Sequence, residues 1–409
     1  MKYLVLLLFQ IPILSFSQVH TLSYFIAQAQ NTNPALKDYQ AQLRSIRLDS
    51  QLLQASRRPQ VNFISNNSYA PIINGYGYDA PITNIANVSA LVQASRNFIS
   101  QSNLGAQYRT IALQSRALLD TIRLSQRDLQ RTITDQYLTA YSSLLQVDFN
   151  KELYELLKRE EAVLKKLTQV SVYKETDYLT FYTTMQQQEL FYLQAQIQYN
   201  TEYLTLNYLS GIFDTTIQRL EAPDLSEVVQ TDFYNSPFYT RYITDSLRIA
   251  NERALIRYQY KPRVGAYTDA GYNSTMQYQP YKSFGFSAGI SLTVPIYDGR
   301  QRLLQNAKLS VQEQRRQTSK DFFVAQHQLQ VAQLQQQLRA TNLLTQKIEQ
   351  QITYTRALIA ANNKLLETGD IVIRDYVLSI NNYLAAQNAL TQNNISRLRT
   401  LNELTYWNP

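Results

Sequence analysis

Apolar positions follow two different periods along this chain. In GFSAGISLTV, residues 285–294, they alternate with Gly, Ser and Thr, which is the two-residue period of a strand with two unlike faces. From Gln301 to Thr368 they recur at helical spacing, and no Gly or Pro interrupts them. These 68 residues would form a helix roughly 100 Å long. The sequence therefore predicts a two-faced strand leading directly into a helix too long for a globular core.

The long helix is predicted to pack along a narrow apolar seam. Its surface is otherwise neutral and polar, with 15 glutamines. Such a seam favours coiled-coil packing. A solvated rod is the alternative, but a rod does not account for the strands. The predicted anchors of the seam are Leu334, Leu338, Leu344, Ile348 and Ile352.

The pattern of a helix followed by two strands occurs twice in the chain. Segments beginning at Asn33 and Ser236 each have a proline at their second position and another 25 residues later. Proline suits the first turn of a helix and cannot continue a helix from within. Each segment therefore predicts a helix, and each is followed by two strand-like runs that indicate a hairpin. The prolines are Pro34 and Pro59 in the first copy, and Pro237 and Pro262 in the second.

A second repeated motif lies late in each copy, and we call it the Asp-Tyr echo. SVYKETDYL from Ser171 and GDIVIRDYV from Gly369 both place an Asp-Tyr pair six residues after their start. A turn followed by an aspartate is typical of a new helix, because a carboxylate caps free backbone N–H groups. Each long helix is therefore expected to reverse here into a shorter one, with Asp177 and Asp375 near its start.

The N-terminus predicts a secretory signal. A lysine precedes an apolar run of about a dozen residues, and small residues precede Gln18. A membrane anchor is the alternative, but the run is shorter than the roughly 20 residues a spanning helix needs. The expected organisation is a signal peptide at 1–17, a first repeat at 18–210, a linker at 211–235 and a second repeat at 236–409. The first repeat is expected to contain a hairpin at about 60–99, a long helix at about 100–170 and a returning helix at about 175–210. The second is expected to contain a hairpin at about 263–297, a long helix at about 300–368 and a returning helix at about 372–405.

Composition argues against catalysis. The absence of cysteine excludes disulfides, thiolate metal sites and cysteine nucleophiles. The two histidines, His20 and His327, are far apart, so we expect no metal site, no cofactor and no enzyme activity, with His327 at a helix surface or seam. The net charge of +8 is spread along the chain without a basic arm, so nucleic acid is not an expected partner.

Exported strands with an apolar face must be covered, and four per chain cannot close a barrel wide enough to conduct. Several chains that each contribute strands to one barrel would meet both requirements, because strands that span a membrane must pair in a closed barrel. The motifs together, namely the two Asn/Ser-Pro…Arg/Lys-Pro helices, LTVPIYDGRQ and the Gly369–Asp375 turn, resemble the TolC-type outer-membrane efflux family.

This resemblance implies a mainly α fold with membrane β-structure: three protomers form a 12-stranded outer-membrane barrel continued by a coiled-coil tunnel across the periplasm. The linker would join an equatorial girdle around the tunnel. The protein would be a homotrimer in outer-membrane lipid and would conduct passively for a periplasmic adaptor and an inner-membrane pump, in efflux or type I secretion. The alternative is a non-conducting periplasmic adaptor or scaffold, although adaptors usually carry a single helical hairpin inserted in β-rich domains.

The resemblance also assigns residues. Aspartates line the family's periplasmic constriction and make it cation-preferring; Asp375 matches one of them and Asp177 its partner position. A helix-capping role for both is the simpler alternative and is compatible with the first. The arginine and tyrosine of the family's closed-state latch align with Ile371 and Leu366, so a substitute latch would have to come from residues nearby. The possible gate contacts are Arg374, Lys174 and Gly369.

The last strand would meet the tunnel at Pro295, Asp298 and Gly299. We expect Pro295 where the strand leaves the bilayer, and Asp298-Gly299 as the turn into the tunnel wall. The side chains expected to face lipid are Phe286, Ile290, Leu292 and Val294. Tyrosines around the hairpins indicate either an interfacial girdle or ordinary strand preference. They are Tyr69, Tyr76, Tyr78, Tyr267, Tyr272, Tyr278 and Tyr281.

Overall fold

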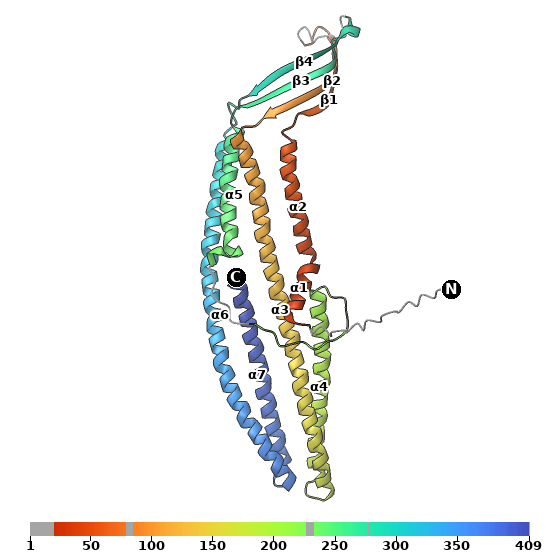
Figure 1. The fold of residues 1–409 in the computed structure, drawn as a ribbon, viewed down its shortest axis with the longest axis vertical. Coiled ribbons are helices and arrows are strands. Elements are labelled where there is room, and N and C mark those ends of the chain that lie inside the picture. Colours follow the sequence, from red (N-terminus) through yellow and green to blue (C-terminus); the bar gives the residue numbers. More distant parts are fainter. Residues whose placement is uncertain (1–19, 79–84, 226–232, 277–278, 409) are drawn as a thin grey trace, which may run out of the picture. The chain divides into compact units, whose positions relative to one another are not determined.

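A computed structural model describes residues 20–78, 85–225, 233–276 and 279–408. The predicted signal peptide at 1–17, part of the linker, and Tyr278 lie outside these residues. The chain is mainly helical with one sheet (Figure 1). Its elements are α1 (Leu22–Thr32), α2 (Pro34–Ala55), β1 (Gln60–Ala70), β2 (Ile85–Phe98), α3 (Gln101–Gln169), α4 (Glu175–Leu209), η1 (Phe233–Asn235), α5 (Pro237–Gln259), β3 (Arg263–Ser274), η2 (Pro280–Lys282), β4 (Phe284–Thr293), α6 (Gln301–Thr368) and α7 (Ile373–Trp407).

The prolines predicted to open helices are the first residues of α2 and α5, and Ser236 caps α5 by accepting from the Tyr239 N–H at 3.3 Å. Helix α1 was not predicted. The packed units also cut across the two sequence repeats. The sheet unit comprises Ala35–Leu124 and Phe233–Ala325, and the helical unit comprises Ser125–Asp232, Gln326–Pro409 and the segment up to Pro34. Each unit therefore takes elements from both repeats.

The sheet is antiparallel throughout, in the order β1-β2-β3-β4 (Figure 1). Its register aligns Phe286 with Ala270, Ala270 with Val92, and Val92 with Phe63, so one apolar row crosses all four strands. Among the described residues, nothing covers these side chains: Phe286 is 87% exposed and Phe63 is 70% exposed. The neighbouring row on the other face is Ser287, Asp269, Gln93 and Asn62. The predicted two-faced sheet is confirmed.

The hairpin tyrosines divide between the two faces. Tyr272 lies on the apolar face, where its ring contacts Phe284 at 5.3 Å between centroids, and by strand alternation Tyr69 shares that face. Tyr267 lies on the polar face and covers Gly289, where a Cβ would come within 2.6 Å of its ring. Tyr267 therefore does not share the apolar face with Tyr69 and Tyr272.

In the helical unit, α6 packs with a strict heptad seam. Its inward residues follow alternating steps of three and four, the spacing of a coiled coil. The prediction was right for Leu334, Ile348 and Ile352, which are buried, and wrong for Leu344, which is 50% exposed. Threonines occupy the seam beside Leu344 instead. The inward series is Val331, Leu334, Leu338, Thr341, Thr345, Ile348, Ile352, Thr355, Ile359, Asn362 and Leu366.

The seam threonines are held by an amide from the neighbouring helix. Buried Asn393 of α7 donates to the Thr341 carbonyl at 2.9 Å and to the Thr345 hydroxyl at 2.7 Å. Asn251 of α5 repeats the arrangement on α3 in the sheet unit, donating to the Ala106 carbonyl at 2.9 Å and the Thr110 hydroxyl at 2.8 Å. We call this arrangement an amide clamp. It joins two helices where a narrow seam offers little apolar area to bury.

The two largest hydrophobic clusters both lie in the helical unit. One joins α1, α3, α4 and the start of the linker, with Phe25, Tyr137 and Tyr203 fully buried. The other joins α3, α4, α6 and α7 next to their connecting turns. Within the described residues, no helix contains a stretch long and apolar enough to cross a membrane.

Removing one amide clamp should loosen one helix pair. Asn393→Ala leaves the Thr345 hydroxyl without its donor and should cost about 1–3 kcal/mol of unfolding free energy. Asn394→Ala, on the adjacent and less buried residue, is the matched control and should change it by less than about 0.5 kcal/mol. The loss of helical circular dichroism on heating measures both. Equal melting temperatures for the two variants would contradict the clamp.

Candidate functional site

The two helix reversals have the same backbone geometry. At the end of α3, the Val172 N–H donates to the Leu167 carbonyl at 2.9 Å, and Ser171 has φ of 64°. At the end of α6, the Asp370 N–H donates to the Leu365 carbonyl at 2.9 Å, and Gly369 has φ of 82°. Both are Schellman turns, in which a left-handed residue ends the helix. The sequence echo thus marks a shared helix-ending turn, made by glycine in one copy and by serine in the other.

The two turns touch each other. A Cβ on Gly369 would lie 2.5 Å from Cγ1 of Val172, so the close approach requires glycine at this position. The Tyr173 hydroxyl donates to the Leu366 carbonyl at 3.3 Å. The α3–α4 turn and the α6–α7 turn therefore form one packed tip, which we call the turn pair.

Asp177 and Asp375 occupy the same position, the third residue of α4 and of α7. Asp177 accepts from the Lys174 N–H at 3.3 Å and so caps its helix. Asp375 instead lies 3.2 Å from the Arg374 guanidinium, in a pair whose side chains are 52% and 84% exposed. Such an exposed pair is weak. The two echoed acids thus have different local roles.

Ile371 and Leu366 belong to the packing beneath the turn pair rather than to a polar latch. Leu366 is fully buried and Ile371 packs against the same cluster. The guanidinium of Arg374 contacts its own neighbour Asp375, so that contact does not join the two hairpins.

A polar network missed by the sequence analysis joins the hairpins. The Tyr376 hydroxyl of α7 donates to the side-chain oxygen of Asn363 in α6, and Asn363 Nδ2 donates to Glu160 Oε1 of α3 at 3.1 Å. Phe181 and Tyr376 stack beside it, with ring centroids 5.9 Å apart. The repeated Asp-Tyr pair was the sequence signal for these tyrosine hydrogen bonds. In the first copy, the Tyr178 hydroxyl likewise donates to a residue of the preceding long helix, Glu161 of α3, at 2.6 Å.

Burial and hydrogen bonding determine the protonation states of Tyr376, Tyr178 and Glu160. Burial raises the pKa of Tyr376, and the hydrogen bond to Glu161 is the largest cause raising the pKa of Tyr178 to about 12. Both tyrosines are therefore neutral donors at physiological pH. Burial also raises the pKa of Glu160 above its ordinary value, outweighing the opposing effect of the Asn363 hydrogen bond.

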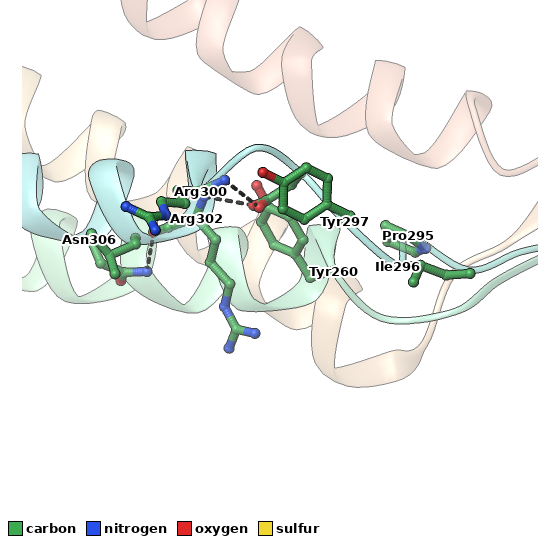
Figure 2. Close-up of a pocket in the computed structure, with 9 residues that line it drawn as sticks. Tyr260, Pro295, Ile296, Tyr297, Arg300, Arg302 and Asn306 are labelled. Atoms are coloured by element: carbon green, nitrogen blue, oxygen red, sulfur yellow. Dashed lines mark hydrogen bonds between the residues drawn. The ribbon is translucent and has the colours of Figure 1, made fainter.

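The predicted strand-to-helix junction belongs to the sheet unit. Asp298 accepts from the Arg300 N–H at 3.0 Å and the Arg302 N–H at 2.8 Å (Figure 2). These N–H groups, above all that of Arg302, lower the pKa of Asp298. Gly299 and Arg300 both have positive φ, 62° and 70°, which turns the chain sharply into α6. Pro295 lies between β4 and this turn.

Within the described residues, no group of three or more acidic or histidine side chains converges to hold a metal ion. His327 is buried, and its Nε2 lies 2.9 Å from the Trp407 carbonyl, which places it in a helix seam.

Neither a scan of protein-family models nor a search of curated sequences finds a match. Solved structures do match. The CmeC outer-membrane channel of Campylobacter jejuni has a TM-score of 0.74 at 13% identity, covering 94% of this chain and 85% of that one. The outer-membrane protein VceC of Vibrio cholerae has a TM-score of 0.74 at 14% identity, covering 94% and 95%. This chain has the TolC-type outer-membrane channel fold. The open-state MtrE channel of Neisseria gonorrhoeae agrees, with a TM-score of 0.72 at 12% identity, covering 94% and 88%.

The TolC-type fold predicted from the sequence motifs is therefore confirmed. At 12–14% identity the likeness establishes the fold alone.

Replacing Glu160 tests the buried network. Because its folded-state pKa is raised, ionised Glu160 destabilises the folded protein at neutral pH, and this penalty disappears as pH falls toward its ordinary value of about 4.5. Glu160→Gln keeps an acceptor for Asn363 and removes the charge. It should raise the melting temperature at pH 7, with the gain shrinking toward pH 4.5. Glu152→Gln, at an exposed position of α3, should not. A gain that does not depend on pH would refute the assignment.

Proposed function

We propose that this protein is the outer-membrane channel of an export system, extending into the periplasm. The observation that carries the proposal is the sheet: one predominantly apolar face that no described residue covers, joined to long seam-packed helices. Such a face fits the hydrocarbon of a membrane, while the polar face of Gly, Ser, Thr, Asn and Gln fits a water-filled lumen. The solved channels of the same fold support this reading.

The sheet edges support assembly with further copies. β1 and β4 each have a neighbour on one side only. Unpaired backbone groups are not tolerated in lipid, and a four-stranded sheet cannot close on itself around a pore. Because β1 and β4 run in opposite directions, β4 of one copy can pair antiparallel with β1 of the next. Three chains would supply the twelve strands expected from the sequence.

The turn pair is the proposed periplasmic constriction. Threefold symmetry would bring three copies of Asp375 together, and a ring of carboxylates focuses a negative potential that favours cations. Asp375 suits this role better than Asp177, whose carboxylate caps α4. Arg374 is then a gate contact that moderates the charge of Asp375.

Besides the possible gate contacts Arg374 and Lys174, two hydrogen bonds between the hairpins would hold the proposed gate. Near the turns, these bonds run from Asn363 to Glu160 and from Tyr173 to the Leu366 carbonyl. Moving the α6–α7 hairpin away from α3–α4 must break both. Gly369 acts by allowing the close approach to Val172.

Energy for export is proposed to come from a partner pump, reached through a periplasmic adaptor, with conduction itself passive. The turn pair offers a docking surface, since Val170 is 68% exposed and Val172 is 46% exposed at the helix ends. A non-conducting adaptor or scaffold is less favoured, because such a protein has no use for a sheet whose apolar face is uncovered.

Neutralising the proposed ring should change ion selectivity. The full chain reconstituted in a planar bilayer under a KCl gradient should show a cation-preferring reversal potential, and Asp375→Asn should shift it toward zero. Asp49→Asn, which removes the same charge from an exposed site on α2, is the control and should leave it unchanged. An unaltered reversal potential in Asp375→Asn would overturn the constriction, and a lack of any conductance would overturn the channel itself.

A further inference from the structure

Basic residues gather at one end of the sheet. The register aligns Gln60 with Ser95 and Arg263 with Thr293, so β1 and β3 begin where β2 and β4 end. All four strands join helices at this end. The segments at these joints, 57–60, 94–100, 257–264 and 293–302, contain a single acidic residue, Asp298. Their basic residues, which we call the basic collar, are Arg57, Arg58, Arg96, Arg257, Lys261, Arg263, Arg300 and Arg302.

The opposite end of the sheet lacks such a charge. Among the described residues of the hairpin connections, 71–78, 275–276 and 279–283, the charged side chain is Lys282. The collar is also accessible, since every member except the half-buried Arg57 is exposed. The asymmetry therefore places an exposed cationic band at the helix end of the apolar face.

Collar cations lie beside aromatic rings. Arg96 lies 5.6 Å from the Phe98 ring centroid, Arg302 lies 5.6 Å from that of Tyr260, and Lys261 lies 5.1 Å from that of Tyr258. Long basic side chains with aromatic neighbours are typical of membrane–water interfaces, where the stems and rings contact apolar groups and the charges contact water or headgroups. The collar has this interfacial composition where the apolar face ends.

The strand-to-helix junction contains an open pocket of about 470 Å³ within this band (Figure 2). Arg300 and Arg302 line it together with Tyr260 and the apolar Ile296, which is 96% exposed. The Asp298 carboxylate accepts two backbone N–H groups, and no ion pair involving either arginine occurs among the described residues. The pocket thus combines two guanidinium groups with an uncovered apolar side chain.

We propose that the basic collar binds the headgroup phosphates of anionic phospholipids in the periplasmic leaflet, with the Arg300–Arg302 pocket as one headgroup site. The inference rests on the proposed function, which places the apolar face in the membrane hydrocarbon. Headgroups then lie where that face ends, at the collar. Guanidinium groups bind phosphate oxygens well, and clustered basic residues select anionic lipid. Ile296 and Tyr297 would contact the adjoining acyl chains.

The test compares lipid binding by the full chain in detergent. Fluorescent phosphatidylglycerol should bind more tightly than fluorescent phosphatidylcholine. Arg300→Gln/Arg302→Gln should weaken phosphatidylglycerol binding about 10- to 30-fold and leave phosphatidylcholine binding unchanged. A second collar variant, Arg58→Gln/Arg96→Gln, should weaken it in the same direction, because the register places Arg96 on the apolar face. The control Arg339→Gln/Lys347→Gln removes two exposed charges from α6 and should have no effect.

Three results would overturn the collar site: equal affinity of the wild type for the two lipids, unchanged affinity in both collar variants, or displacement of the lipid by an equal concentration of inorganic phosphate. The last would indicate a free-phosphate site. Bilayer conductance of the same preparations separates the two proposals. Conducting protein without lipid preference would refute the collar alone, whereas protein that never conducts would refute both.

Discussion

The unpaired backbone at the two edges of the sheet is the constraint on which the rest of the structure depends. β1 and β4 each leave one row of N–H and C=O groups without a strand partner among the described residues. In water, such long edges with an apolar face would promote aggregation, and in lipid they would be prohibitively unfavourable. In the proposed assembly, pairing with neighbouring copies around a closed ring would satisfy the edges, and a bilayer would cover the apolar face. One assembly would resolve both problems.

The helices face a related constraint, because the wall of the proposed tunnel would have no centre in which to bury a core. The helical unit is stabilised by a heptad seam on α6, by local hydrophobic clusters and by the Asn393 clamp, and the Asn251 clamp joins two helices of the sheet unit. Each clamp satisfies a buried amide through a neighbouring helix, and a buried amide without such a partner is costly. Specific pairing between helices is thereby obtained with little apolar area. This accounts for Thr341, Thr345 and Asn393 at seam positions that would otherwise be expected to carry leucine.

The sequence was sufficient for the features that are encoded locally. Strand alternation, the stretches free of Gly and Pro, and the placement of Pro34 and Pro237 predicted the hairpins, the long helices and their starts. Features that depend on distant partners were missed. Thr341 and Thr345 lie in the seam because Asn393 reaches them from another helix, so Leu344 was chosen wrongly. Helix α1 was missed because its cluster is completed by α3, α4 and the linker.

The site shows the same division. The Asp-Tyr echo located both turns, but only the structure separates the capping Asp177 from the exposed Asp375. The contact between Asn363 and Glu160 joins residues 203 positions apart, a separation at which no local pattern is informative. The pairing of Gly369 with Val172 likewise required the two hairpins to be placed together.

Disulfide cross-linking between the edge strands tests the central claim most directly. The chain has no native cysteine, so every cross-link must come from introduced residues. Ser65→Cys on β1 would be combined in turn with Phe286→Cys, Ala288→Cys or Ile290→Cys on β4, all on the apolar face, to scan the register. In outer membranes, we expect one register to give covalent dimers and trimers and nothing larger. Monomers at every register, or a ladder that extends beyond three chains, would contradict it.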